Sequence, residues 1–359
     1  MIRVMIVDDS ALVRSLLSDM LSRDPGIEVV ATASDPYFAR DKFKKLQPDV
    51  LTLDVEMPRM DGLTFLEKLM SFRPTPVVMI SSLTERGAQT TLQALALGAV
   101  DFVTKPSANV QEALPILERE IVAKVKAAAR ANMKKSRPVK LKVVEPGQEK
   151  NHEDKVLIDD VLQATNRKVT KGEKVICIGA STGGTVAIES LLTCLPGNLP
   201  GIVIVQHMPA GFTKAFADRV NLLCEMEVVE GEPGMDVSRG RAIIAPGGRH
   251  MLLQRKGSGY YVDIKDGPPV NRHKPSVDVL FRSAANSAGA NALGVILTGM
   301  GDDGAKGMLD LYNTEAYTIA QDEKSCVVFG MPRVAIELGG VEKIASLETI
   351  PSLIVQLVR

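Results

Sequence analysis

The feature that most constrains the fold is a regular alternation between short apolar runs and longer segments whose apolar residues recur at helical spacing. The segment after the first run, for example, has apolar residues at Leu12, Leu16 and Met20, as an amphipathic helix would. Within residues 1–131 the apolar runs are Val4–Val7, Ile27–Val30, Val50–Leu53, Val77–Ile80 and Val100–Val103. Five units of this kind predict an α/β fold with a five-stranded parallel sheet and helices on both of its faces.

A second, doubly wound α/β domain is predicted over residues 173–359, where the alternation resumes. Residues 132–172 are polar and charged and contain several Pro and Gly residues, which predicts a linker. Its basic start, residues 134–142, is either a solvated tether or a docking strip for a partner. One piece, Val156–Ala164, has helix-like spacing and is a candidate for docking on a neighbouring domain. The apolar runs of the second domain are Val175–Ile178, Gly201–Val205, Ala242–Ala245, Tyr260–Ile264, Ala292–Leu297 and Ala316–Ala320.

Composition excludes several classes of protein. The 43 basic and 43 acidic side chains cancel, so no net charge draws the chain to nucleic acid or to an anionic membrane. Aromatic residues make up 4% of the chain and Trp is absent, which argues against base-stacking platforms. No apolar run approaches the roughly 18 residues that span a bilayer, no signal peptide is evident, and the four cysteines form no CxxC pair. We expect a monomeric cytoplasmic protein that neither binds nucleic acid nor inserts into membranes.

Polar residues follow four of the five strands predicted in the first domain. Asp8 and Asp9 follow the first, Asp54 the third, Ser81 the fourth and Lys105 the fifth. Because ligands bind at the carboxyl ends of parallel strands, these side chains should meet, and the carboxylates would repel one another without a cation. Mg²⁺ accepts such a ligand set, and the combination suits phosphoryl transfer to a carboxylate. Helix capping or surface exposure would explain any one of these residues alone, but not all of them together.

The motifs VDDS, LDVEMPRMDG, MISS and VTKP resemble those of response-regulator receiver domains, over essentially all of residues 1–131. The resemblance implies a flavodoxin-like receiver fold in which Asp54 accepts the phosphoryl group. It implies that Ser81 and Lys105 contact that group. It further implies that Mg²⁺ is held by Asp8, Asp9, Asp54 and the carbonyl of Glu56.

Polar residues follow three apolar runs of the second domain. Ser181 lies in GASTG directly after one run, and this G-x-S-x-G pattern fits a nucleophile on a tight turn, although a Gly-rich loop could equally cradle a phosphate. His207 follows a second run. Asp302 and Asp303 follow a third, where a tight turn is the alternative explanation. A hydroxyl, an imidazole and a carboxylate at one sheet edge predict a Ser–His–Asp hydrolase. The order of the three along the chain differs from that of α/β-hydrolases.

The motifs GASTGG, VQHMP, NRHKPSVDVLF, GVILTGMGDDGAKGM and SCVVFGMPR resemble those of the CheB chemotaxis methylesterase family, over roughly residues 173–359. The resemblance implies that Ser181 is the nucleophile, His207 the base and Asp303 the orienting acid. Thr182 and Met300 would donate backbone N–H groups to an oxyanion hole. The family commonly carries an amide before the catalytic acid, where this chain has Asp302, and the alignment of the motif favours Asp303 as the acid.

The family's activity is hydrolysis of glutamate methyl esters, with deamidation of glutamine, on the cytoplasmic helices of chemoreceptors. The resemblance therefore implies a phosphorylation-activated enzyme of chemotactic adaptation, with a histidine kinase as phosphodonor. Mg²⁺ would serve the receiver domain, and hydrolysis would need no cofactor. The domain pairing predicts that the receiver obstructs access to Ser181 until Asp54 is phosphorylated. Two alternatives stay open: a response regulator with a DNA- or protein-binding output, and a receiver-linked serine hydrolase of other specificity.

Overall fold

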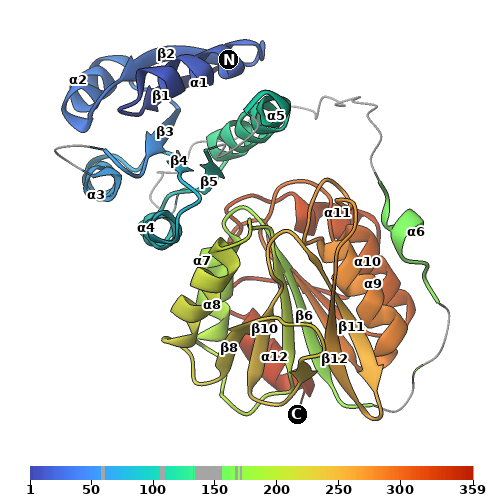
Figure 1. The fold of residues 1–359 in the computed structure, drawn as a ribbon. Coiled ribbons are helices and arrows are strands. Elements are labelled where there is room, and N and C mark those ends of the chain that lie inside the picture. The colour runs from blue at the N-terminus through green and yellow to red at the C-terminus, as the bar shows by residue number, and fades with distance from the viewer. Residues whose placement is uncertain are drawn as a thin grey trace.

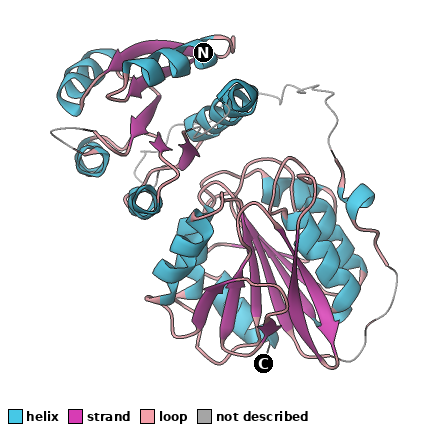
Figure 2. Ribbon diagram, viewed as in Figure 1, coloured by secondary structure: helices cyan, strands magenta, loops and turns pink. Residues whose placement is uncertain are grey.

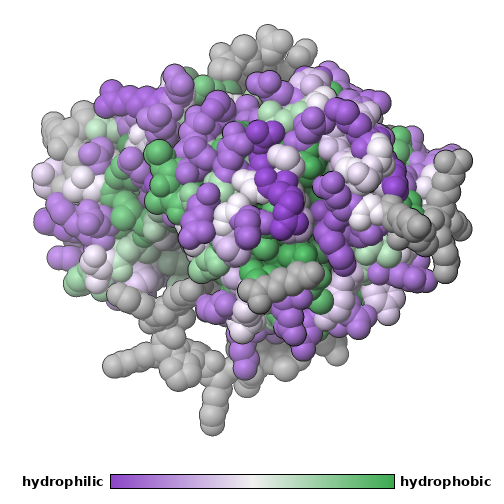
Figure 3. Space-filling view, turned by 90° about the horizontal axis from the view of Figure 1, so that it is seen from below, coloured by the Kyte–Doolittle hydropathy of each residue, from purple (hydrophilic) through white to green (hydrophobic). Residues whose placement is uncertain are grey.

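The computed structural model describes residues 1–57, 61–105, 110–131, 133, 156–165, 169 and 172–358. The chain forms two α/β domains, each built on its own sheet, as Figures 1 and 2 show. None of the described helices is long and apolar enough to cross a lipid bilayer. On the face drawn in Figure 3, hydrophilic residues cover most of the surface, and hydrophobic residues lie among them in smaller areas.

The N-terminal domain contains the predicted five-stranded parallel sheet, in the order β2-β1-β3-β4-β5. Its fully buried residues lie on the strands and on the helix faces turned toward them, as the apolar spacing predicts. The elements are β1 (Ile2–Val7), α1 (Ala11–Ser22), β2 (Ile27–Ala33), α2 (Pro36–Leu46), β3 (Val50–Asp54), α3 (Gly62–Phe72), β4 (Val77–Ser81), α4 (Glu85–Ala96), β5 (Asp101–Thr104) and α5 (Val110–Ala129).

The C-terminal domain is built on a seven-stranded sheet in the order β15-β14-β13-β6-β7-β10-β8, and every strand pair in it is parallel. Its larger elements are β6 (Val175–Ala180), α7 (Gly184–Leu192), β7 (Ile202–Gln206), α8 (Phe212–Asn221), β8 (Glu227–Glu230), β10 (Arg241–Ile244), α9 (Val277–Ser287), β13 (Ala292–Ile296), α10 (Ala305–Asn313), β14 (Tyr317–Gln321), α11 (Met331–Glu337), β15 (Lys343–Ala345) and α12 (Ile350–Val358). A 3₁₀ turn at Gly289–Asn291 precedes β13. The predicted doubly wound α/β fold is therefore confirmed.

Helices cover both faces of this sheet. α7, α8 and α12 pack on one face, and α9, α10 and α11 pack on the other (Figure 1). The order of the strands reverses beside β6, because the chain leaves β6 for β7 on one side and returns to β13 on the other. Ligand sites of open α/β sheets lie at such a switch point, beyond the carboxyl ends of the strands.

A second, smaller sheet was not anticipated from the sequence. It is antiparallel, in the order β11-β12-β9, and consists of β9 (Asp236–Val237), β11 (His250–Lys256) and β12 (Gly259–Lys265). The apolar run Tyr260–Ile264 is a strand, as predicted, but it belongs to this sheet. Its buried residues alternate with partly exposed ones, which is the pattern of a sheet with one covered face.

The connection between the domains includes a piece that packs on the C-terminal domain. Helix α6 (Ile158–Val161) lies in it, and Ile158 is fully buried against residues of that domain. The predicted docking of Val156–Ala164 is thus confirmed. The basic start of the predicted linker lies outside the described residues, and the predicted limits of the domains stay predictions.

Close packing of β6 against α9 depends on Gly179. A Cβ atom at this position would lie 2.2 Å from Val277 Cγ1 and 3.1 Å from Phe281 Cζ. We expect Gly179→Ala to lower the free energy of unfolding by about 1–3 kcal/mol, the usual cost of overpacking a core. Gly259→Ala is the control, since the nearest atom to its added Cβ would be 3.9 Å away. Thermal melts followed by circular dichroism measure both, and equal midpoints would contradict this account of the packing.

Candidate functional site

Ser181, His207 and Asp303 meet at the carboxyl edge of the seven-stranded sheet. They follow β6, β7 and β13, which are neighbours in the sheet. Ser181 Oγ lies 3.1 Å from His207 Nδ1, and His207 Nε2 lies 2.8 Å from Asp303 Oδ2. The hydroxyl, the ring and the carboxylate therefore form an unbroken chain of hydrogen bonds.

Asp303, the acid in this chain of hydrogen bonds, is held by the first turn of α9. Asp303 is fully buried, and its oxygens accept from the backbone N–H groups of Val277 and Asp278 at 2.6 and 3.3 Å. The hydroxyl of Ser276, which also caps α9, donates to Asp303 Oδ1 at 2.7 Å. A helix N-terminus stabilises negative charge through its free N–H groups and its dipole. This part of the fold therefore keeps an ionised carboxylate in the interior.

The pKa of Asp303 is consistent with that role. Burial alone would raise the pKa of this carboxyl, but the hydrogen bond from His207 and the charge of that ring outweigh burial and lower it. An ionised Asp303 can only accept a hydrogen bond, so His207 donates its Nε2–H to it. The lone pair on His207 Nδ1 is then free to accept from the hydroxyl of Ser181. In that tautomer the ring can take the proton of an attacking serine.

Asp302, the neighbouring acid, has a different environment. Its side chain is 41% exposed and lies 3.8 Å from the guanidinium of Arg272. Of the two consecutive acids, Asp303 is the one whose carboxylate faces His207.

The two residues expected to form an oxyanion hole lie beside Ser181. Thr182 follows it in the chain. The loop carrying Met300 is close as well, because a Cβ at Gly299 would lie 2.9 Å from Ser181 Cβ. Within the described part of the chain, the backbone N–H groups of Thr182 and Met300 donate to no protein acceptor. Both donors are thus available to an oxygen that develops charge near Ser181.

The acids of the receiver domain also meet at a sheet edge. Oxygens of Asp8, Asp9 and Asp54 lie within 4.8 Å of one another. Lys105 Nζ lies 2.8 Å from Asp54 Oδ2 and 3.1 Å from Asp8 Oδ2. The Asp8 oxygen is buried and, despite this ion pair, accepts no hydrogen bond. Burial, opposed by the hydrogen bond from Lys105, raises the pKa of Asp54 to about 6. Clustered carboxylates with an unsatisfied oxygen are suitable ligands for Mg²⁺.

Two other residues expected at the receiver site are placed less directly. The Ser81 hydroxyl bonds to α4, because it accepts from Thr91 Oγ1 at 2.7 Å and lies 3.3 Å from the Gly87 carbonyl. The backbone N–H of Glu56 donates to Asp54 Oδ1 at 3.3 Å. The structure therefore brings Asp8, Asp9, Asp54 and Lys105 together, whereas Ser81 points its hydroxyl toward a helix.

Comparison with known proteins places both domains. A family model described as CheB methylesterase matches residues 176–354, and one described as response regulator receiver domain matches residues 4–114. A protein-glutamate methylesterase/protein-glutamine glutaminase of Geobacter metallireducens is 56% identical over 350 residues, or 98% of this chain and 94% of the relative. A protein of the same name from Salmonella typhimurium is 53% identical, over 97% of this chain and 95% of the relative.

The chain belongs to the CheB methylesterase family. A solved structure agrees with this assignment: the CheB methylesterase catalytic domain of Thermotoga maritima is 37% identical, with a TM-score of 0.51, over 52% of this chain and 99% of that one.

In this CheB-family chain the receiver lies directly against the candidate active site. Thr182 Oγ1 donates to Asp101 Oδ2 of the receiver, with an oxygen–oxygen distance of 2.5 Å. The ring of Phe102 stacks on Phe212 of α8, with centroids 4.6 Å apart. Apolar residues of α4, α7 and α8 belong to one continuous buried cluster. The carboxyl of Asp101 is itself held by Lys124, whose Nζ lies 3.3 Å away.

Reasoning from the sequence missed four residues around Asp303 and His207. Asn271 donates to Asp303 Oδ1 at 2.9 Å, and the ring of His273 stacks on His207 with centroids 3.7 Å apart. Ser276 and Asp278 belong to the helix N-terminus described above. All four lie in the motif NRHKPSVDVLF, which was used only to recognise the family. Four polar residues close together in one motif are the sequence signal that could have identified them as part of the site.

The proximity of the three receiver carboxylates gives a test of metal binding. We expect Asp9→Asn to weaken Mg²⁺ binding by at least about tenfold, since even changes next to the ligands produce losses of that size. Asp41→Asn, which changes an exposed acid on α2, should leave the affinity as it is. Isothermal titration of the two variants with MgCl₂ provides the measurement. Equal affinities would remove Asp9 from the ligand set.

Proposed function

We propose that this chain hydrolyses glutamate methyl esters, and deamidates glutamine side chains, on the cytoplasmic helices of chemoreceptors. The observation that carries the proposal is the pair of hydrogen bonds that link Ser181 Oγ to the His207 ring and the ring to Asp303. The names of relatives more than 50% identical over nearly the whole chain support the substrate. The enzyme would work in the cytoplasm, with a chemotaxis histidine kinase as phosphodonor.

The chemistry follows from the positions of the three side chains. Ser181 Oγ attacks the ester carbonyl carbon while His207 Nδ1 takes its proton, and Asp303 stabilises the charged ring. The N–H groups of Thr182 and Met300 receive the developing oxyanion, each worth roughly 3–4 kcal/mol in comparable sites. Methanol leaves with the proton from His207, and water then releases the acyl group from Ser181. An amide substrate follows the same course with ammonia as leaving group, which makes protonation by His207 more important.

Regulation would come from the receiver. Asp54 would accept the phosphoryl group, with Asp8, Asp9, Asp54 and the Glu56 carbonyl holding Mg²⁺ and with Lys105 and Ser81 contacting the phosphoryl oxygens. Mg²⁺, when bound, would neutralise the charge of the transferring group. Docked as it is, the receiver places Asp101 on the side chain of Thr182. Phosphorylation would weaken this contact and open the site to a receptor helix.

The nucleophile has a direct test. We expect Ser181→Ala to abolish methanol release from methylated receptor membranes, because loss of a triad residue can cost roughly 10⁴–10⁶-fold in rate. Wild-type protein is measured in parallel, with Mg²⁺ and acetyl phosphate as a small phosphodonor. Release at the wild-type rate would reject Ser181. Cleaved receptor backbone in place of methanol would indicate a serine hydrolase of other specificity.

The inhibitory contact has a test of its own. Asp101→Ala removes the acceptor of the Thr182 hydrogen bond, and we expect activity without phosphodonor to rise about 2- to 10-fold, equivalent to the net value of one such bond. Asp41→Ala, an exposed receiver acid on α2, is the control and should change nothing. Methanol release without acetyl phosphate is the measurement. An unchanged basal rate in Asp101→Ala would show that this contact does not restrain the enzyme.

A further inference from the structure

A segment outside the regions matched by both family models contacts helices and a turn that lie beside the candidate active site. We define residues 156–165 as the strap. It lies along the outer side of α9 and α10 (Figure 1). The strap precedes the region matched by the methylesterase family model, which begins at residue 176, and contacts residues inside that region.

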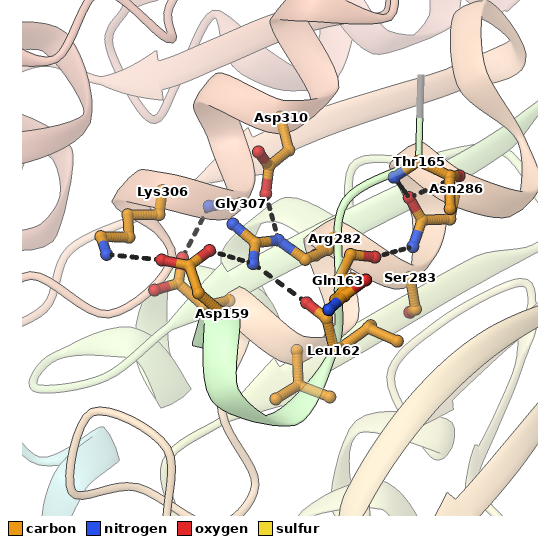
Figure 4. A network of polar contacts seen from close by, with 12 residues as sticks. Asp159, Leu162, Gln163, Thr165, Arg282, Ser283, Asn286, Lys306, Gly307 and Asp310 are labelled. Atoms are coloured by element: carbon orange, nitrogen blue, oxygen red, sulfur yellow. Dashed lines mark hydrogen bonds and ion pairs between the residues drawn. The ribbon is translucent and has the colours of Figure 1, made fainter. Parts of the chain in front are cut away.

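The strap is fastened by a buried arginine. Arg282 of α9 has a side chain only 5% exposed, and its Nη1 donates to Asp159 Oδ1 at 2.5 Å and to the Leu162 carbonyl at 3.0 Å (Figure 4). The Nε of the same guanidinium donates to Asp310 of α10 at 2.6 Å. Lys306 adds a second cation 3.2 Å from Asp159. One side chain thus joins the strap to two helices that flank the candidate site.

Further contacts extend along the strap. Asn286 donates to the Gln163 carbonyl at 3.0 Å and accepts from the backbone N–H of Thr165 at 2.8 Å (Figure 4). Ile158 is fully buried in a small cluster with Leu252, Val270 and Val279. The strap is therefore fixed at several points along its length.

The strap also holds a tight turn of the catalytic domain, residues 270–273. The turn is closed by reciprocal hydrogen bonds between Val270 and His273, 3.0 and 2.9 Å long. Its central residues, Asn271 and Arg272, have φ angles of +49° and +72°. Non-glycine residues keep such a conformation only when their surroundings impose it. The strap is part of those surroundings, because Ile158 packs on Val270 and the Val156 carbonyl accepts from the Asn271 backbone N–H at 3.1 Å.

On its inner side the turn touches the acid and the base. The Asn271 side-chain amide lies between two buried carboxylates, donating to Asp303 Oδ1 at 2.9 Å and to Asp278 Oδ2 at 2.5 Å. Burial, followed by the charge of Asp303, raises the pKa of Asp278 to about 7. An amide that gives one hydrogen to each acid keeps both in place. Asn271 is thereby suited to fix the orientation of Asp303 toward His207.

We propose that the strap is a working part of the active site, which positions Asn271 and, through its amide, the Asp303 carboxylate. This inference rests on the triad of the proposed function. Asn271 is a positioning residue, because its amide donates to Asp303 and Asp278 and would act on the reaction through Asp303. The strap acts on the rate of the serine step and not on the docking of the receiver.

The test uses the whole 359-residue chain and measures the rate at which a fluorophosphonate labels Ser181. Ile158→Asp places a charge in the apolar cluster and detaches the strap. Val161→Asp makes the same change at an exposed position of the same helix. We expect Ile158→Asp to slow labelling by about 10- to 100-fold, as small misplacements of catalytic groups do. Val161→Asp should stay within about twofold of wild type, and Ile158→Val should restore most of the rate.

Two further measurements separate positioning from other roles. The loss in Ile158→Asp should be the same factor with and without acetyl phosphate; a loss confined to one condition would place the strap in regulation and overturn the proposal. Asn271→Gly removes the amide while allowing the positive φ. The double variant, which combines Ile158→Asp with Asn271→Gly, should be labelled no more slowly than Asn271→Gly alone. The effects of residues that act through one contact are not additive. Effects that multiply would refute action through Asn271.

The labelling experiment still tests the strap if a variant is unstable or if the substrate is not a glutamate methyl ester. Should Ile158→Asp lose its cooperative melt, Ile158→Ala, which only removes contacts, is judged by the same criteria. A normal labelling rate in folded Ile158 variants would overturn the proposal. Labelling depends on the serine and not on the ester, so absence of methanol release would count against the proposed function and leave the test of the strap intact.

Discussion

The geometry of the candidate active site depends on keeping one carboxylate ionised inside the protein. An isolated buried charge is costly, and a protein normally avoids it by neutralising the group. Here the N-terminus of α9 supplies backbone and hydroxyl donors to Asp303, and His207 supplies a further one. Because the backbone and hydroxyl donors come from the start of α9, which packs against β6 and β13, the position of the acid is set by the packing of the core. The same packing places Ser181 at the end of β6, so the site and the sheet are stabilised together.

The residues at strand ends could be predicted because a parallel sheet has a simple rule. Each apolar run ends at a known residue, and the carboxyl ends of all strands share one edge. That rule brought Asp8, Asp9 and Asp54 together in one domain, and Ser181, His207 and Asp303 in the other. The antiparallel sheet β11-β12-β9 escaped prediction because an apolar run does not tell which strand it pairs with. Asn271 escaped because its function requires a left-handed turn and two carboxylates from distant positions, none of which leaves a periodic signal.

Contacts between the domains were also beyond the reach of local patterns. The sequence indicated that a receiver precedes an enzyme, and from that pairing a covering arrangement was expected. The sequence could not identify Asp101 as the residue that contacts Thr182. Asp101 is the first residue of β5, and nothing in the local pattern distinguishes it from other strand residues. The stacking of Phe102 on Phe212 was equally hidden. Surface complementarity depends on shapes assembled from many elements, and single residues reveal it only after both domains are folded.

Strand β5 connects the two sites by a short path. Lys105, one residue beyond its carboxyl end, contacts Asp54, and Asp101 at its other end contacts Thr182. Four strand residues span only about 13 Å, and backbone pairing with β4 keeps them from bending independently. If Lys105 moves toward a phosphoryl group on Asp54, the displacement acts on a strand whose far end bears the Asp101 carboxylate. Phe102, which follows Asp101, lies on Phe212 of the catalytic domain. A shift of this one strand would therefore disturb the polar and the aromatic contact together.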